Sequence, residues 1–152
     1  MENSESNTLT EIQDRLDHHI SSFSKKISRD KSKAYYFKLT TITLTFLATL
    51  ALGVEGLEDE QVELKNFAFF CTAAVTFVTG IDLFYNHKGL WVQYTKTRNV
   101  LYQIKDDLNF LVSAKGASEV SVDELAEFHK RIQACLNECN EWWVKERQNA
   151  KA

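Results

Sequence analysis

Residues 39–54 read LTTITLTFLATLALGV and carry no charge on any face of a helix. A second uncharged stretch, residues 67–81, follows after an acidic connector. Each stretch is shorter than the roughly 20 residues that a membrane-spanning helix needs, but apolar and aromatic flanks lengthen both. We therefore predict a transmembrane hairpin with spans at 34–54 and 67–85 and an external acidic loop at 55–66.

The composition of the whole chain predicts an all-α protein. The 152 residues include no proline and only five glycines, so helix breakers are rare. The net charge of −3 gives no basic field for a nucleic-acid partner. The three cysteines do not resemble a disulfide framework and fit reduced thiols facing a cytoplasm. The first residues are polar and contain no signal peptide.

Basic residues are placed asymmetrically around the two stretches. Several precede the first stretch and others follow the second, whereas the connector carries only Lys65. The flanking basic residues are Lys25, Lys26, Arg29, Lys31, Lys33, Lys38, His87, Lys88, Lys96 and Arg98. Since basic loops stay in the cytoplasm, we expect a membrane protein with both termini cytoplasmic. The alternative is a soluble bundle that buries the two stretches as core helices, although such helices usually keep one polar face.

Small and hydroxylated residues recur four apart in both predicted spans. The candidates for a pore lining or a hairpin interface are Thr41, Thr45, Thr49, Thr72, Thr76 and Gly80. Two roles stay open for these rows. They allow close packing of the two helices, as small residues do in membranes, or they line a water-filled path in an oligomer.

Polar and aromatic residues mark the predicted membrane boundary. Lys38 and Asp82 fall at similar depth, where they either pair within the hairpin or ring the mouth of a pore. The aromatic residues expected at the interface are Tyr35, Tyr36, Tyr85 and Trp91.

Three further segments have the spacing of amphipathic helices and predict a cytosolic bundle continuous with the hairpin. We expect a disordered 1–7, then helices over 8–33, 86–115 and 121–148. Their apolar rows are Leu9, Ile12, Leu16, His19, Phe23 and Ile27; Tyr94, Leu101 and Leu108; Thr97, Ile104 and Leu111; Leu125, Ile132 and Cys139; and Phe128, Cys135 and Trp142. Ser121 and Glu124 form a capping box ahead of the last helix.

The sequence contains no enzyme signature and no cofactor motif. Cys135 and Cys139 lie four apart on one helix face, but a closed zinc site needs about four ligands and only His129 is near. Both cysteines fall on apolar rows, so we expect them in the core. His19 is on an apolar row as well and is expected to be a packed residue rather than a ligand. We expect no metal site.

The pattern as a whole resembles the SLATT domain, a family of bacterial two-transmembrane effectors. The stretch that carries the resemblance runs from Thr76 to Lys88 and leads to Trp91. It is joined by Tyr94, Thr97, Leu101, Trp142 and Trp143. Many members carry acidic residues near the positions of Asn99 and Ile104, where this chain has none.

The resemblance implies an effector that oligomerises in the inner membrane and opens a pore or disrupts the bilayer in antiphage defence. Its expected partners are the lipid bilayer, further copies of itself, and a separate sensor protein or nucleotide signal. The alternative is a membrane-anchored helical scaffold that recruits a cytosolic partner. A soluble interaction bundle is the third possibility.

Overall fold

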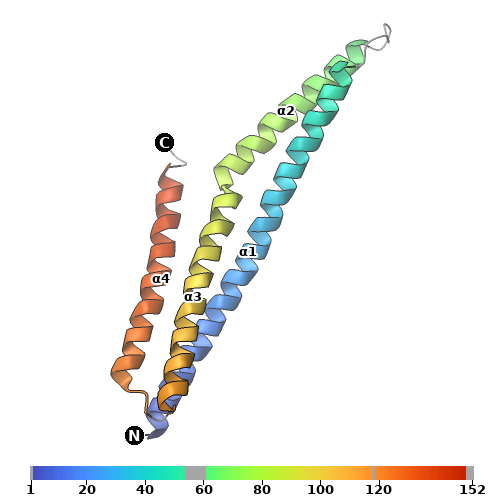
Figure 1. Ribbon diagram of the computed structural model, residues 1–152. Helices are drawn as coiled ribbons and strands as arrows, with labels where there is room; N and C mark the ends of the chain where they lie inside the picture. Colours follow the sequence, from blue (N-terminus) through green and yellow to red (C-terminus); the bar gives the residue numbers. More distant parts are fainter. Residues whose placement is uncertain (1, 54–60, 118, 150–152) are drawn as a thin grey trace. The chain divides into compact units, whose positions relative to one another are not determined.

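The protein is described by a computed structural model that covers residues 2–53, 61–117 and 119–149. Every regular element among these residues is an α-helix, which confirms the predicted all-α class (Figure 1). In chain order the helices are α1 (Glu2–Gly53), α2 (Gln61–Tyr85), α3 (His87–Lys115) and α4 (Val122–Asn149).

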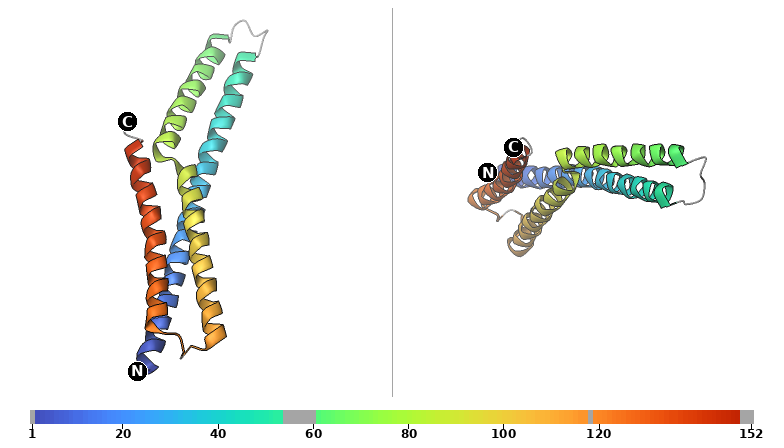
Figure 2. Two further views of the ribbon diagram at one scale, coloured as in Figure 1. Left: turned by 60° about the vertical axis from the view of Figure 1, so that its left-hand side comes forward. Right: turned by 90° about the horizontal axis from the view of Figure 1, so that it is seen from above.

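The chain divides into two compact units. Residues 1–28 and 89–152 form the bundle unit, which holds the first part of α1 together with α3 and α4. Residues 29–88 form the helix-pair unit, which holds the second part of α1 and all of α2. In the helix-pair unit, the two helices run side by side in opposite directions (Figure 2).

The bundle unit is built on the predicted apolar rows. Its core consists of Leu9, Ile12, Leu16, Ile20, Phe23, Leu101, Ile104, Leu108, Val120, Leu125, Phe128, Ile132, Cys135 and Cys139. Tyr94 and Leu111 pack against this core as half-buried side chains, and Thr97 is also buried. The alternating spacing of three and four residues keeps these positions on one face of each helix, because a helix has 3.6 residues per turn. His19 and Trp142 are only half-buried, at the edge of the core.

The capping box at the start of α4 is present as predicted. The Ser121 backbone N–H donates to a Glu124 carboxylate oxygen at 3.1 Å, and the Glu124 N–H donates to the Ser121 hydroxyl at 3.3 Å. Lys115 at the end of α3 also donates to Glu124, and these contacts lower the pKa of the Glu124 carboxyl, with the Lys115 hydrogen bond as the largest cause. Gly116 follows α3 with a φ of +91°, and its N–H donates to the Val112 carbonyl at 2.9 Å, which is the αL termination that glycine favours.

The structure corrects several predicted boundaries. Helix α1 begins at Glu2, so the predicted disorder over 1–7 is wrong for residues 2–7. It then continues without a break to Gly53. Helix α2 begins at Gln61, inside the predicted loop 55–66, and an acidic residue in its first turn, Glu63, suits the positive end of the helix dipole. Residues 54–60 lie outside the described part of the chain.

The sequence predicts a helix over residues 86–115. In the structure, Asn86 lies outside both α2 and α3 and separates the two helices. Asn86 has a φ of 44°, and its N–H donates to the Asp82 carbonyl at 2.8 Å. Asparagine adopts this left-handed conformation more readily than other residues with a side chain, which allows α2 to end at Tyr85 and α3 to start at His87. Helix α4 starts at Val122 and runs to Asn149, within one residue of the predicted bounds.

Replacement of Ile132 by alanine tests the bundle core. Ile132 is fully buried, and Ile132→Ala should lower the free energy of unfolding by about 2–5 kcal/mol because it leaves a cavity. Thermal unfolding of the full chain in detergent, followed by far-UV circular dichroism, measures the effect. Val144→Ala on the same helix is the matched control, since Val144 is exposed. Equal melting temperatures for the two variants would contradict this core.

Candidate functional site

The most unusual surface of the protein is the outside of the helix-pair unit. Large apolar and aromatic side chains cover both of its helices and face outward. The exposed residues are Tyr35, Tyr36, Leu39, Ile42, Phe46, Leu47, Leu50, Leu52, Val62, Phe67, Phe69, Phe70, Phe77, Leu83, Phe84 and Tyr85. We call this set the apolar belt. Contiguous apolar surface on this scale marks contact with another protein or with a membrane.

The buried share of an apolar helix distinguishes a membrane span from the core helix of a soluble protein. Two helical runs are long and apolar enough to cross a membrane, one ending at Gly53 and one beginning at Val62. Only 6% and 11% of their most apolar windows are buried. The core helix of a soluble protein passes the same length and composition test but is mostly buried. The apolar windows of the helix-pair unit are mostly exposed, which favours a membrane span over a buried core helix.

The helix pair is held together by small side chains. Ala48 on α1 and Ala68 and Cys71 on α2 are buried. Leu44 and Val75 are half-buried at similar positions along the pair. Small residues at this interface allow the two backbones to approach closely, as they do between helices in membranes. Small residues therefore pack between the two helices, as one of the two predicted roles requires. They are alanines and a cysteine rather than the threonines.

The predicted threonine and glycine positions lie mainly outside this interface. Thr41 is half-buried, whereas Thr45, Thr49, Thr72, Thr76 and Gly80 are exposed. A Cβ atom placed on Gly80 would meet no atom of a described residue within 4 Å. Thr45, Thr49, Thr72 and Thr76 each directly follow a buried or half-buried position of the pair, namely Leu44, Ala48, Cys71 and Val75. Consecutive residues differ by about 100° around a helix of 3.6 residues per turn, so these threonines point away from the interface. The expectation that both rows pack the hairpin is therefore wrong for these five residues.

The threonine hydroxyls have hydrogen-bond partners on their own helices. Thr45 donates to the Thr41 carbonyl at 2.8 Å and Thr49 to the Thr45 carbonyl at 2.9 Å, and the same pattern recurs for Thr41, Thr72 and Thr76. Each hydroxyl hydrogen is therefore used by the backbone one turn earlier. The lone pairs of these oxygens remain, so the exposed threonines present hydrogen-bond acceptors on an otherwise apolar surface.

Lys38 and Asp82, the predicted boundary charges, do not form an ion pair in the described structure. Lys38 is exposed, whereas the Asp82 Oδ1 atom is buried and has no hydrogen-bond partner. The interpretation in which the two side chains neutralise each other within the hairpin is therefore wrong. A buried carboxylate oxygen without a donor costs free energy, so Asp82 is a strained element of this unit.

The predicted interface aromatics fall into two groups. Tyr35, Tyr36 and Tyr85 belong to the helix-pair unit and are exposed, as expected for rings at a membrane boundary. Trp91 belongs to the bundle unit and is half-buried, and its carbonyl accepts a hydrogen bond from the Thr95 hydroxyl at 2.7 Å.

A polar cluster that sequence reasoning missed joins α1 to the start of α3 within the helix-pair unit. The Asp30 and His87 side chains are only 3% and 8% exposed, and Asp30 Oδ1 lies 3.5 Å from His87 Nδ1. Arg29, which is mostly exposed, also contacts Asp30 at 3.4 Å. The His87 ring is stacked against two aromatic rings, those of Phe37 and Tyr85, with interplanar angles of 13° and 11°. We call these five residues the Asp30–His87 cluster.

The two buried residues of the cluster lie at the two chain ends of the helix-pair unit. Asp30 follows the point where α1 enters the helix-pair unit, and His87 precedes the point where the chain leaves it. The contact between them therefore holds together the segments in which the chain enters and leaves the helix-pair unit. The sequence does contain a signal for it: Asp30 is the only acidic residue between Lys25 and Lys38, and it continues the apolar spacing of Phe23, Ile27 and Phe37.

The described residues of the bundle unit include buried thiols and partly buried histidines. Burial raises the pKa of the Cys135 thiol to about 11, and its Sγ donates to the Thr97 carbonyl at 3.6 Å, which is typical of an inert packing cysteine. Burial also lowers the pKa of His19, with smaller contributions from His18, Arg15 and Lys26. Among the described residues, no group of three or more His, Cys, Asp and Glu side chains is placed to hold a metal ion.

Comparison with protein-family models, curated proteins and solved structures gave no match to this chain.

A charge placed in the apolar belt should separate membrane contact from ordinary surface exposure. Phe77 in the belt is 69% exposed, and Phe110 in the bundle unit is 77% exposed, so arginine fits sterically at both sites. Phe77→Arg should weaken membrane insertion by about 3 kcal/mol, the cost of arginine near the centre of a span. Membrane pelleting after alkaline carbonate extraction measures this, and Phe110→Arg should pellet like the wild type. Equal behaviour of both variants would exclude the belt as lipid-facing.

Removal of the His87 ring should destabilise the helix-pair unit. His87→Ala deletes both ring contacts and leaves a cavity beside Asp30, at a cost of about 3 kcal/mol. The thermal midpoint of the full chain in detergent measures the change, and Lys88→Ala, at the exposed neighbouring position, is the control. A double-mutant cycle with Asp30→Ala should show coupling of at least about 0.5 kcal/mol, and additive effects would refute the contact.

Proposed function

We propose that this protein is an effector of the bacterial inner membrane that assembles into homo-oligomers and forms a pore. In this proposal, the helix-pair unit is a transmembrane hairpin and the bundle unit is cytosolic and continuous with it. The single observation that carries the proposal is the apolar belt, because its uncharged side chains face outward from both helices. A surface of this kind is stable in lipid and unstable in water.

The exposed threonines support a pore rather than a simple anchor. An anchor needs only apolar side chains on its lipid-facing surface, yet Thr45, Thr49, Thr72 and Thr76 are exposed among them. Their hydroxyl hydrogens are used within the helix, so their oxygens are free to accept hydrogen bonds from water or to contact a cation. Association of several copies through this face would remove the threonines from lipid and surround a polar path with oxygen atoms.

The unsatisfied carboxylate of Asp82 supports the same arrangement. Asp82 is three residues from the end of α2 at Tyr85, and its Oδ1 has no partner in a single chain. Ionisable residues in membrane segments usually face a water-filled cavity or a pairing partner. In an oligomer, a ring of Asp82 side chains at the mouth of the pore would be hydrated and would favour cations over anions.

The charge distribution supports an orientation with both termini in the cytoplasm. Basic residues flank the two spans on the side of the termini, and the connector over 55–66 is acidic. Together with the resemblance to SLATT effectors, this leads us to propose a role in antiphage defence, in which a separate sensor protein or a nucleotide signal activates the pore.

Removal of the exposed hydroxyls should reduce ion flux if they line the path. Purified protein in liposomes should conduct K⁺, measured with an encapsulated K⁺-sensitive dye over a range of membrane potentials. The isosteric variant Thr45→Val should reduce flux about 2- to 10-fold, the cost of one typical hydrogen bond. Thr45→Ser keeps the hydroxyl and should conduct like the wild type, and size-exclusion chromatography should show one oligomer for all three proteins.

The same experiment distinguishes the proposal from a scaffold. A bilayer that stays impermeable with the wild-type protein under every potential and protein density would exclude the pore and leave a membrane-anchored scaffold. Flux that is unchanged in Thr45→Val, with the oligomer intact, would remove this threonine from the conducting path.

A further inference from the structure

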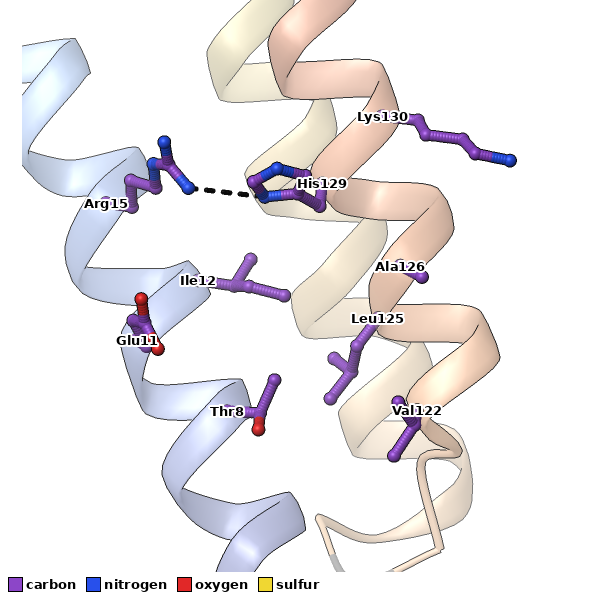
Figure 3. Close-up of a pocket in the computed structure, with 9 residues that line it drawn as sticks. All are labelled: Thr8, Glu11, Ile12, Arg15, Val122, Leu125, Ala126, His129 and Lys130. Atoms are coloured by element: carbon purple, nitrogen blue, oxygen red, sulfur yellow. Dashed lines mark hydrogen bonds between the residues drawn. The ribbon is translucent and has the colours of Figure 1, made fainter.

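A groove lies in the bundle unit between the first turns of α1 and the start of α4 (Figure 3). Its volume is about 380 Å³, which is within the range of small-molecule binding pockets. Its lining residues are Thr8, Glu11, Ile12, Arg15, Val122, Leu125, Ala126, His129 and Lys130. All of them belong to the bundle unit, so the groove is separate from the helix-pair unit and from the proposed pore.

The interior of the groove is apolar. The Ile12 and Leu125 side chains, both part of the buried core, point into it from opposite helices (Figure 3). Val122 and Ala126 on α4 extend this surface toward solvent. These side chains are already held in place by the core. The apolar part of a ligand could therefore bind against them with little loss of side-chain conformational entropy.

One end of the groove carries a cation that no described carboxylate neutralises. Arg15 on α1 reaches across the groove to His129 on α4, where its Nη1 donates to the His129 Nδ1 at 3.3 Å. Arginine has no acceptor atom, so Arg15 is the donor in this contact. This contact uses one N–H of the guanidinium and leaves four donors. Glu11 lies one turn earlier on α1, yet the structure records no ion pair between it and Arg15.

We propose that this groove binds a small molecule that carries one oxyanion, a carboxylate or a phosphate, on an apolar body. The oxyanion accepts two hydrogen bonds from the Arg15 guanidinium, whose fork matches its geometry. The apolar body lies against Ile12 and Leu125. Glu11 on the rim repels a second anionic group, so the site selects molecules with a single anionic end. Lys130 extends away from the groove and lies 3.9 Å from Glu127, so Arg15 is the recognising cation.

Naphthyl compounds provide small fluorescent probes for this chemistry. The full-length protein in nanodiscs of zwitterionic lipid is titrated with 1-naphthoate, 1-naphthyl phosphate and neutral naphthalene-1-methanol, and empty nanodiscs report partition into lipid. Fluorescence polarisation should show at least one of the two anions binding about tenfold or more tightly than the alcohol, as expected for hydrogen bonds to a charged group. Comparison of the carboxylate with the phosphate identifies which oxyanion the site prefers.

Three variants assign the binding to the groove. Arg15→Gln should weaken binding of the anions about tenfold or more, and Ala126→Phe should abolish binding of all three probes because the ring fills the groove. Arg131→Gln is the matched control, since Arg131 is two residues from His129 but pairs with Asp107 on α3. It should bind the anions as the wild type does, and circular dichroism should show all variants folded.

The inference fails if empty nanodiscs take up the anions as strongly as loaded ones, if the alcohol binds as tightly as both anions, or if folded Arg15→Gln binds the anions unchanged. None of these outcomes depends on ion flux, so the groove and the pore are tested separately.

Discussion

For the membrane setting that we propose, the governing constraint is that a backbone in lipid must satisfy its own hydrogen bonds. A helix satisfies this constraint internally, and the side chains are then free to meet the surroundings. In the helix-pair unit, the large apolar side chains point outward and the small ones inward, with Ala48, Ala68 and Cys71 between the helices. The bundle unit has the opposite arrangement, with its large aliphatic side chains inside and its charges outside. One chain thus contains two units that suit different solvents.

The polar groups of the helix-pair unit differ in whether they have hydrogen-bond partners. The threonine hydroxyls bond to the carbonyls one turn earlier, which removes most of the cost of exposing them to an apolar surrounding. Asp30 and His87 are buried 3.5 Å apart, although His87 Nδ1 has no hydrogen-bond partner among the described residues. The Oδ1 atom of Asp82 also has no hydrogen-bond partner, so assembly or contact with water would stabilise this carboxylate.

The bundle unit is stabilised mainly by its apolar core, whereas its ion pairs position the helices. Lys105 pairs with Asp17 across α3 and α1, and Arg131 pairs with Asp107 across α4 and α3. Lys96 pairs with Glu138 at 2.7 Å, and this hydrogen bond raises the pKa of the Lys96 amine. Pairs that are largely solvent-exposed contribute little to the free energy of unfolding, so their role is to favour one register of the helices over others.

The sequence by itself determined the helical class, the two apolar stretches, the core rows of the bundle and the capping box at Ser121 and Glu124. These features follow from local chemistry: the absence of proline, the spacing of apolar residues and the reach of a side chain to its own backbone. Only the tertiary structure decided which residues face each other. The sequence left open whether the threonine rows pack between the helices or line a path. The structure places alanines and a buried cysteine between the helices, and the threonines, one residue further along, are turned away by about 100°. The Asp30–His87 cluster and the groove beside Arg15 join residues far apart in the sequence, and such contacts depend on helix packing that no local pattern specifies.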